Sequence, residues 1–498
     1  MKKLKSRMIS LLFVLAVVIG MFPVTAFAAG GNVTVKVGGV ALTVNSGGAA
    51  YAKTDTSGNV TTAGATQDDY NIKFEIVDNA PTLTLKDATI NNTNGDGIYA
   101  QGYNLTIVGV DTEKEGANNI SGSKSAIKVC GNITIKGKLG AINSGSDSAI
   151  YTIPSSAFPE ATGNIYISED AVVGDVSSTD WRAIESGFGS ITIDGEVGNV
   201  SGLIGIHSNP AYEHDIAING KVGNISGSEY GILAQNTLNI SDGAEVGDIS
   251  GALGGIMTIS DANISGNVKK VSGQVGIRSL MGDIALSGNV GTIIGTGGAN
   301  QMSASYGVRA DAGKISISDV VGPIRASSKG ENVTVLAVFA KTGIEFTNSV
   351  AIKTPANSKV GTLGSGSYTV FDAAGATVKD LELAYMYTVT YKINGKIVAT
   401  VKVEKGKDAI APAIPEKEGY TARWDHDGKN ITEDTEINAI YTANTHPETD
   451  KADGTSGQAS PGTGENSNIR LWFTLAFVSG SALLVLAVWG SKKKKVNR

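Results

Sequence analysis

The stretch Val173-Gly174-Asp175-Val176-Ser177 recurs at intervals of 24, 25 and 24 residues, as Val197-Gly198-Asn199-Val200-Ser201, Val222-Gly223-Asn224-Ile225-Ser226 and Val246-Gly247-Asp248-Ile249-Ser250. Looser copies begin at Val268, Val290 and Val321. A repeat of this length indicates a solenoid, in which each copy forms one coil and contacts only its neighbours.

Two further patterns keep step with this repeat. The first is a small residue followed by an aliphatic one, at Ile98, Ile127, Ile150, Ile184, Ile206, Ile232, Ile256, Ile277, Val308 and Val338. The second is an apolar-polar-apolar triplet, at 105–107, 133–135, 165–167, 191–193, 216–218, 238–240, 284–286, 315–317 and 344–346. Alternation points the outer two side chains of a triplet to one face, so coils stacked about 4.8 Å apart would bury continuous aliphatic columns. The sequence therefore predicts an all-β fold with three strands per coil.

The pattern resembles the right-handed parallel β-helix domains of secreted Gram-positive surface proteins, which are often labelled carbohydrate-binding. The resemblance implies a β-helix over residues 96–384. Alternating strands in residues 29–95 are expected to cap its first coil, and a closing cap is expected between residues 350 and 383. An uncapped end would expose the apolar core and unpaired strand edges.

The N-terminus predicts export. Four cations within the first seven residues precede an apolar run at 8–21, and Ala26-Phe27-Ala28 follows it. These are the parts of a secretory signal peptide over residues 1–28, with cleavage between Ala28 and Ala29. An uncut membrane anchor is the alternative.

The C-terminus carries a second ordered signal. Ser460-Pro461-Gly462-Thr463-Gly464 precedes an apolar segment at 469–490, expected to be a transmembrane helix, and a basic cytoplasmic tail at 491–498. This order resembles a Gram-positive sorting signal, although Ser460 stands where that motif usually has Leu. The resemblance implies that a sortase thiol attacks the Thr463 carbonyl and transfers the chain to peptidoglycan, with Gly464 the first residue lost. A plain single-pass anchor is the alternative.

The net charge argues against one class of partner, and the cysteine count excludes an internal disulfide. Residues 1–28 carry four cations and no acid, and residues 464–498 carry a net of five positive charges. Their removal takes the formal net charge from −6 to −15. So acidic a surface argues against nucleic acid as a partner. The single Cys130 cannot form an internal disulfide.

Residues 385–443 predict a separate small β module. Alternating strands flank Asn394-Gly395, a strong hairpin signal. The module resembles the small β repeats of Listeria and Bacteroides type surface proteins. We interpret its Trp424 as a core residue rather than an exposed sugar platform. Residues 444–468, rich in Thr, Pro, Gly, Ser, Asp and Glu, are expected to be a linker that includes the sorting motif.

One hypothesis for the β-helix is catalytic, because polysaccharide lyases and glycoside hydrolases share this fold. Such enzymes need clustered or paired carboxylates. Asp180, Arg182 and Glu185 gather around Trp181, and His207 is expected one coil above Glu185. We interpret this group as a solvated, salt-linked patch. No catalytic residue, metal site or cofactor is predicted.

The other hypothesis is binding. The residue after each aliphatic position of the first pattern should point outward, and the next one inward. The inward residues are uniformly small or short, whereas the outward residues vary. The outward residues form the candidate binding face, which consists of Tyr99, Lys128, Tyr151, Glu185, His207, Arg278, Arg309 and Phe339, with Leu233 and Met257 between His207 and Arg278. Aromatic rings beside long polar chains suit a glycan or a host surface protein. The sequence therefore predicts an adhesin-like wall protein; a β-helix enzyme and a spacer without a ligand remain alternatives.

Overall fold

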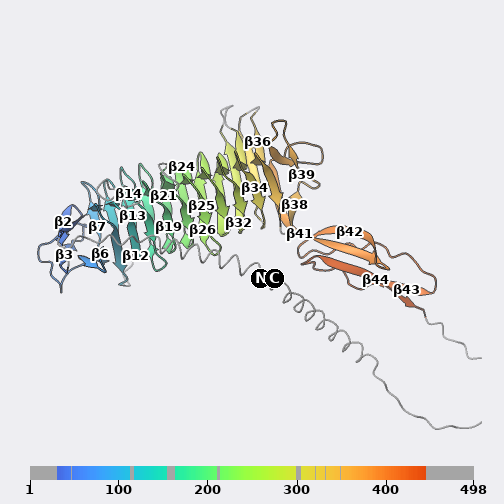
Figure 1. Cartoon of the computed structure of the whole chain (residues 1–498), viewed down its shortest axis with the longest axis horizontal. Helices are drawn as coiled ribbons and strands as arrows, with labels where there is room; N and C mark the ends of the chain where they lie inside the picture. The colour runs from blue at the N-terminus through green and yellow to red at the C-terminus, as the bar shows by residue number, and fades with distance from the viewer. Residues whose placement is uncertain are drawn as a thin grey trace, which may run out of the picture. The chain divides into compact units, whose positions relative to one another are not determined.

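The structure is a computed structural model, and it describes residues 31–444 except 46, 113–116, 154–162, 210–213, 299–303, 320, 331–332 and 348. Within these residues every regular element is a β-strand, which confirms the all-β prediction. Most strands pair in parallel in a long sheet arrangement consistent with a β-helix (Figure 1). The strands of the parallel stack pair with their equivalents in the repeats before and after them and form four ladders, named A to D below. The prediction of three strands per coil is therefore wrong in the repeats where the short ladder D adds a fourth strand.

Ladders B and C contain the two short patterns. Ladder B consists of β8 (Ile98–Gln101), β11 (Ile127–Cys130), β14 (Ile150–Ile153), β18 (Ile184–Ser186), β21 (Val200–Ser208), β24 (Ile225–Ala234), β27 (Gly254–Thr258), β30 (Val275–Ser279), β33 (Ser305–Ala310) and β36 (Val335–Ala340). Ladder C consists of β6 (Ala80–Lys86), β9 (Leu105–Val110), β12 (Ile133–Leu139), β15 (Ile165–Ile167), β19 (Ile191–Ile193), β22 (Ile216–Ile218), β25 (Leu238–Ile240), β28 (Ala262–Ile264), β31 (Ile284–Leu286), β34 (Lys314–Ile317) and β37 (Gly343–Phe346).

Ladders A and D contain the five-residue phrase. Ladder A consists of β7 (Ile90–Asn92), β10 (Ile120–Gly122), β13 (Ile142–Ser144), β17 (Val176–Ser178), the first residues of β21 and β24, and then β26 (Glu245–Gly251), β29 (Asn267–Gly273), β32 (Val290–Gly297) and β35 (Ile324–Ser328). The short ladder D runs from the end of β12 through β16 (Val172–Val173), β20 (Glu196–Val197) and β23 (Lys221–Val222) to the starts of β26, β29 and β32.

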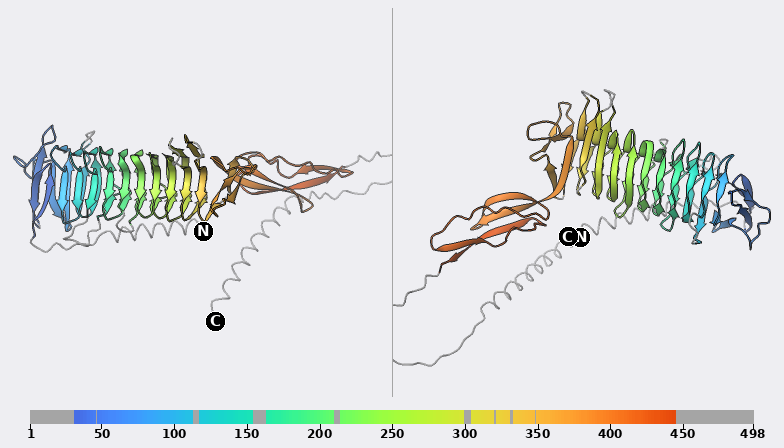
Figure 2. Two further views of the ribbon diagram at one scale, coloured as in Figure 1. Left: turned by 90° about the horizontal axis from the view of Figure 1, so that it is seen from above. Right: turned by 180° about the vertical axis from the view of Figure 1, so that it is seen from behind.

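The interior of this stack is aliphatic. In ladder C, Ile218, Ile240 and Ile264 are fully buried and pair in succession. The predicted inward positions of the triplets therefore form a continuous column, and the repeated layers are visible from both directions in Figure 2. Burial of each such side chain stabilises the fold by roughly 1.5–3 kcal/mol before the entropy cost of ordering.

The small residue before each ladder B aliphatic residue has a steric cause. A Cβ on Gly205 would lie 2.6 Å from the Gly231 carbonyl oxygen of the next repeat, and a Cβ on Gly231 would lie 2.7 Å from that of Gly255. Real Cβ atoms do not approach this closely, so only glycine fits these two positions without a shift of the neighbouring backbone.

Antiparallel strands pair with both ends of the parallel stack. At the N-terminal end, β1 (Val33–Val37) pairs with β2 (Val40–Val44) and β8, while β5 (Ile72–Val77) pairs with β3 (Ala49–Thr54) and β6; β4 (Val60–Thr61) adds to β3. At the other end, β40 (Tyr368–Phe371) pairs with β36 and with β39 (Lys359–Thr362), and β41 (Asp380–Ile393) pairs with β35 and β38 (Val350–Thr354).

The module consists of the second half of β41 with β42 (Lys396–Glu404), β43 (Tyr420–Trp424) and β44 (Thr435–Ala443). β41 pairs antiparallel with β42 and in parallel with β44. Asn394 and Gly395 join β41 to β42 with φ of 51° and 75°, as a type I′ hairpin turn requires. The boundary expected at residue 385 falls inside β41, because this strand runs without a break from the last pairing of the stack into the hairpin.

Candidate functional site

The candidate binding face is one uninterrupted ladder. Its residues pair in parallel with one another from repeat to repeat, in the order Tyr99, Lys128, Tyr151, Glu185, His207, Leu233, Met257, Arg278, Arg309 and Phe339. The structure therefore brings all eight predicted residues into a single line, with Leu233 and Met257 in the middle.

Exposure along this line is uneven. Eight of the ten side chains are half-buried, but Glu185 is only 2% exposed and His207 only 3%. The expected salt link is confirmed, because Arg182 and Glu185 form an ion pair. The expectation that the patch is solvated is wrong for Glu185 and His207, whereas Asp180 is exposed. Neighbouring side chains cover Glu185 and His207, and sequence alternation alone gives no account of that cover.

A second line of residues, most of them buried, runs beside the first, three residues earlier in each strand. Ile204, Tyr230, Gly254, Val275, Tyr306 and Leu336 pair in succession at the corner between ladders A and B. Arg182 holds the equivalent place three residues before Glu185. Sequence reasoning missed the two tyrosines of this line; their constant offset from the ladder B positions was the available signal. We call the two lines, together with the adjacent Trp181, the ladder B strip.

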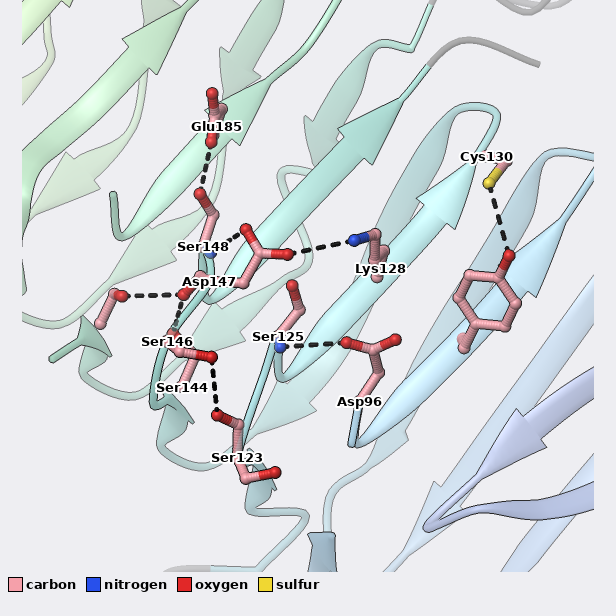
Figure 3. Close-up of polar contacts among 12 residues, drawn as sticks. Asp96, Ser123, Ser125, Lys128, Cys130, Ser144, Ser146, Asp147, Ser148 and Glu185 are labelled. Carbon is pink, nitrogen blue, oxygen red and sulfur yellow. Dashed lines mark hydrogen bonds and ion pairs between the residues drawn. The ribbon is translucent and has the colours of Figure 1, made fainter. Parts of the chain in front are cut away.

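A buried ion cluster lies within the strip. Arg182 Nη1 donates to Glu185 Oε1 at 3.1 Å, and the Ser148 hydroxyl donates to Glu185 Oε2 (Figure 3). His207 Nδ1 lies 3.6 Å from Glu185 Oε1, beyond hydrogen-bond range. Burial by itself would raise the pKa of Glu185, but the neighbouring His207, Ser148 and Arg182 outweigh it and hold the pKa below its ordinary value. Glu185 is therefore a buried carboxylate that stays ionised.

Two buried nitrogen atoms of this cluster lack hydrogen-bond partners. Arg182 Nε and His207 Nδ1 are buried and make no hydrogen bond. The Arg182 guanidinium also lies over the Trp181 ring, with Cζ 4.4 Å from the ring centroid. Trp181 is 39% exposed as a residue, so this corner presents a large hydrophobic residue to solvent.

Tyrosines and a lysine form the N-terminal end of the strip. Lys128 Nζ lies 3.1 Å from Asp147 Oδ2 and 5.1 Å from the Tyr151 ring centroid (Figure 3). Burial, with the charges of Glu185 and Asp147, raises the pKa of Tyr151 to about 12. The Tyr99 hydroxyl lies 3.1 Å from Gln101 Oε1 and 3.9 Å from the buried Cys130 Sγ. At neutral pH both phenols are uncharged hydrogen-bonding groups.

The C-terminal end pairs arginines with aromatic rings. Arg278 and Arg309 share the Asp311 carboxylate, with Arg278 Nη2 at 2.7 Å. Arg309 also covers the Tyr306 ring at 4.4 Å, and Tyr306 meets Phe339 edge to face with centroids 5.7 Å apart. Tyr306 itself is buried, so the half-buried Arg278, Arg309 and Phe339 are the side chains that this end of the strip presents. Rings beside fixed donors can contact a polar ring or a protein surface.

The described residues contain no group of three or more His, Cys, Asp and Glu side chains that could hold a metal ion. The signal cleavage residues Ala28 and Ala29, the motif from Ser460 to Gly464 and the apolar segment 469–490 all lie outside the described residues. Within them, no helix is long and apolar enough to cross a membrane.

The module has a small core of its own. Tyr391 is fully buried, and its ring meets Trp424 edge to face with centroids 4.9 Å apart. Trp424 Nε1 donates to the Pro412 carbonyl oxygen at 3.1 Å. Trp424 is thus partly buried and packs in the core, as the sequence predicted.

Residues 387–446 match the Listeria-Bacteroides repeat domain. The resemblance of this module to Listeria and Bacteroides type repeats is thereby confirmed. Listeria-Bacteroides repeat domains occur in extracellular surface proteins, and the domain in this chain indicates such a protein. No curated protein and no solved structure matches the chain.

Proposed function

We propose that this chain is a cell-wall-anchored surface protein, and that its ladder B strip binds a glycan or a surface protein of another cell. The match of residues 387–446 to a surface-protein repeat supports the location. Rings and hydrogen-bonding side chains at both ends of one ladder, with Leu233 and Met257 between them, support binding. The fold that carries the strip is a right-handed parallel β-helix, since parallel crossovers are right-handed in nearly all proteins.

Display depends on the two terminal signals. A signal peptidase removes residues 1–28, and a sortase joins Thr463 to peptidoglycan after the apolar segment has held the chain in the membrane. Digestion of the wall with a muralytic enzyme should then release the protein. Thr463→Ala should instead stay in the membrane fraction, and equal membrane retention of both forms would refute sortase anchoring.

We propose a binding role rather than a catalytic one because the acidic group at the strip is out of reach. The Glu185 side chain is 3% exposed and that of His207 is 4%. A general acid must approach the scissile bond within hydrogen-bond distance. Glu185 instead holds Arg182 in place.

Retention on polysaccharides and on host glycoproteins tests binding. The protein should be retained without shortening a polysaccharide, and the double variant Tyr99→Ala, Tyr151→Ala should be retained less. Tyr166→Ala is the matched control, because Tyr166 is a half-buried tyrosine on the outer face of ladder C. New reducing ends that disappear in Glu185→Gln would instead establish an enzyme, and neither retention nor product would leave a spacer.

A further inference from the structure

Trp181 is held more firmly than its exposure suggests. Its backbone N–H donates to Ser178 Oγ at 3.0 Å, and its carbonyl accepts from the Leu203 N–H of the next repeat at 2.6 Å. Both bonds fix the corner from which the ring projects. A ring displayed on a fixed backbone loses little conformational entropy on binding.

Arg182 supplies donors beside this ring. Its guanidinium stacks on Trp181 and is oriented from below by Glu185, while its Nε remains unpartnered. Nε itself is buried, but the Arg182 side chain as a whole is 20% exposed. A ligand hydroxyl could therefore accept a hydrogen bond from the part of the guanidinium that solvent reaches.

The charges around Trp181 determine which class of sugar ring can bind there. Glu185 compensates the charge of Arg182 within the cluster, and the exposed Asp180 adds a negative charge next to Trp181. The mature chain is acidic overall. An anionic sugar would therefore meet repulsion without a free cation to offset it, whereas an uncharged sugar would not.

We propose that Trp181 and Arg182 form the main sugar subsite of the ladder B strip, and that this subsite takes an uncharged pyranose ring. The apolar face of the sugar stacks on Trp181, and its hydroxyls accept hydrogen bonds from Arg182. This inference rests on the proposed function and specifies its ligand class. It also adds Trp181 and Arg182, at the corner between ladders A and B, to the predicted face.

The test compares the full-length chain and its variants on immobilised neutral glycans (β-glucan, mannan, galactan) and acidic ones (polygalacturonate, hyaluronan). The wild type should bind at least one neutral glycan and no acidic one. Trp181→Ala should weaken this binding about tenfold, and Trp181→Tyr should restore most of it. Because the ring is partly exposed, thermal melting of Trp181→Ala should stay close to that of the wild type.

The outcomes separate this inference from the broader proposal. Unchanged binding by Trp181→Ala, together with loss in the Tyr99 and Tyr151 double variant, would refute the subsite while the strip stays the binding face. Binding of acidic glycans alone would refute the ligand class. Absence of all glycan binding in the wild type would overturn both the subsite and the glycan part of the proposed function.

Discussion

Substitution of Ile240 tests the register on which the binding face depends. Ile240 is fully buried in β25, between Ile218 and Ile264 of the neighbouring repeats. Ile240→Ala removes three carbon atoms from the core, worth about 2.4 kcal/mol at about 0.8 kcal/mol per methylene. The remaining cavity should raise the loss of unfolding free energy to roughly 3–4 kcal/mol.

The adjacent Asn239 is the matched control. It is half-buried on the outer face, where its Oδ1 accepts one hydrogen bond from Asn263 Nδ2 at 3.0 Å. Asn239→Ala should cost only about 0.5–1 kcal/mol. Urea denaturation, followed by far-ultraviolet circular dichroism, gives the midpoint urea concentration of each variant. We compare midpoints because repeat proteins can unfold in parts, and a midpoint does not require two-state unfolding. An equal shift for both variants, or a larger one for Asn239→Ala, would show that the inward and outward faces are assigned wrongly.

Three further perturbations test the strip and its supports. Glu185→Gln should destabilise the protein by about 1–3 kcal/mol at neutral pH. The folded pKa of Glu185 lies below its ordinary value of 4.5, so the stabilisation by this carboxylate is present above pH 4.5 and is lost as the pH falls through the folded pKa. The difference in melting temperature between wild type and variant should therefore shrink below pH 4.5, and a constant difference would argue against an ionised Glu185. Burial raises the pKa of both Tyr151 and Tyr166 to about 12, so in an ultraviolet difference titration the absorbance change near pH 12 should be smaller in Tyr151→Phe than in the wild type. A loss of absorbance change near pH 10 instead would contradict the burial of Tyr151. Gly231→Ala should lower the melting temperature more than Gly243→Ala does. A Cβ at residue 231 would meet backbone atoms, whereas one at residue 243 would meet open space, although Gly243 has a positive φ. The reverse order would contradict the tight packing at Gly231.

The register of the strands could be predicted because each short strand carries its own alternation. Alternation within a triplet predicted that Ile240 points inward and Asn239 outward. Alternation also placed Tyr99 and Phe339 in one ladder, where they lie nine pairings apart. β28 was missed among the triplets: Ala262 holds an inward position, and alanine carries too weak a hydrophobic signal to mark it.

The burial of Glu185 and His207 could not be read from the sequence. Arg182 and Ser148 contact Glu185 from the corner and from the preceding repeat, so these contacts join side chains that alternation treats as independent. The module boundary could not be predicted either, because β41 pairs first with strands of the stack and then with strands of the module, and its alternating pattern continues through both. Hydrophobic pattern thus determined which face a residue occupies, and side-chain contacts across repeats determined how exposed it is.

Mass spectrometry of the termini of the protein released from purified cell walls tests the central claim, display at the cell surface, most directly. The account predicts an N-terminus at Ala29 and a C-terminal peptide that ends at Thr463 and carries a peptidoglycan fragment. Recovery of a chain that retains residues 464–498, or one that begins at Met1, would contradict it.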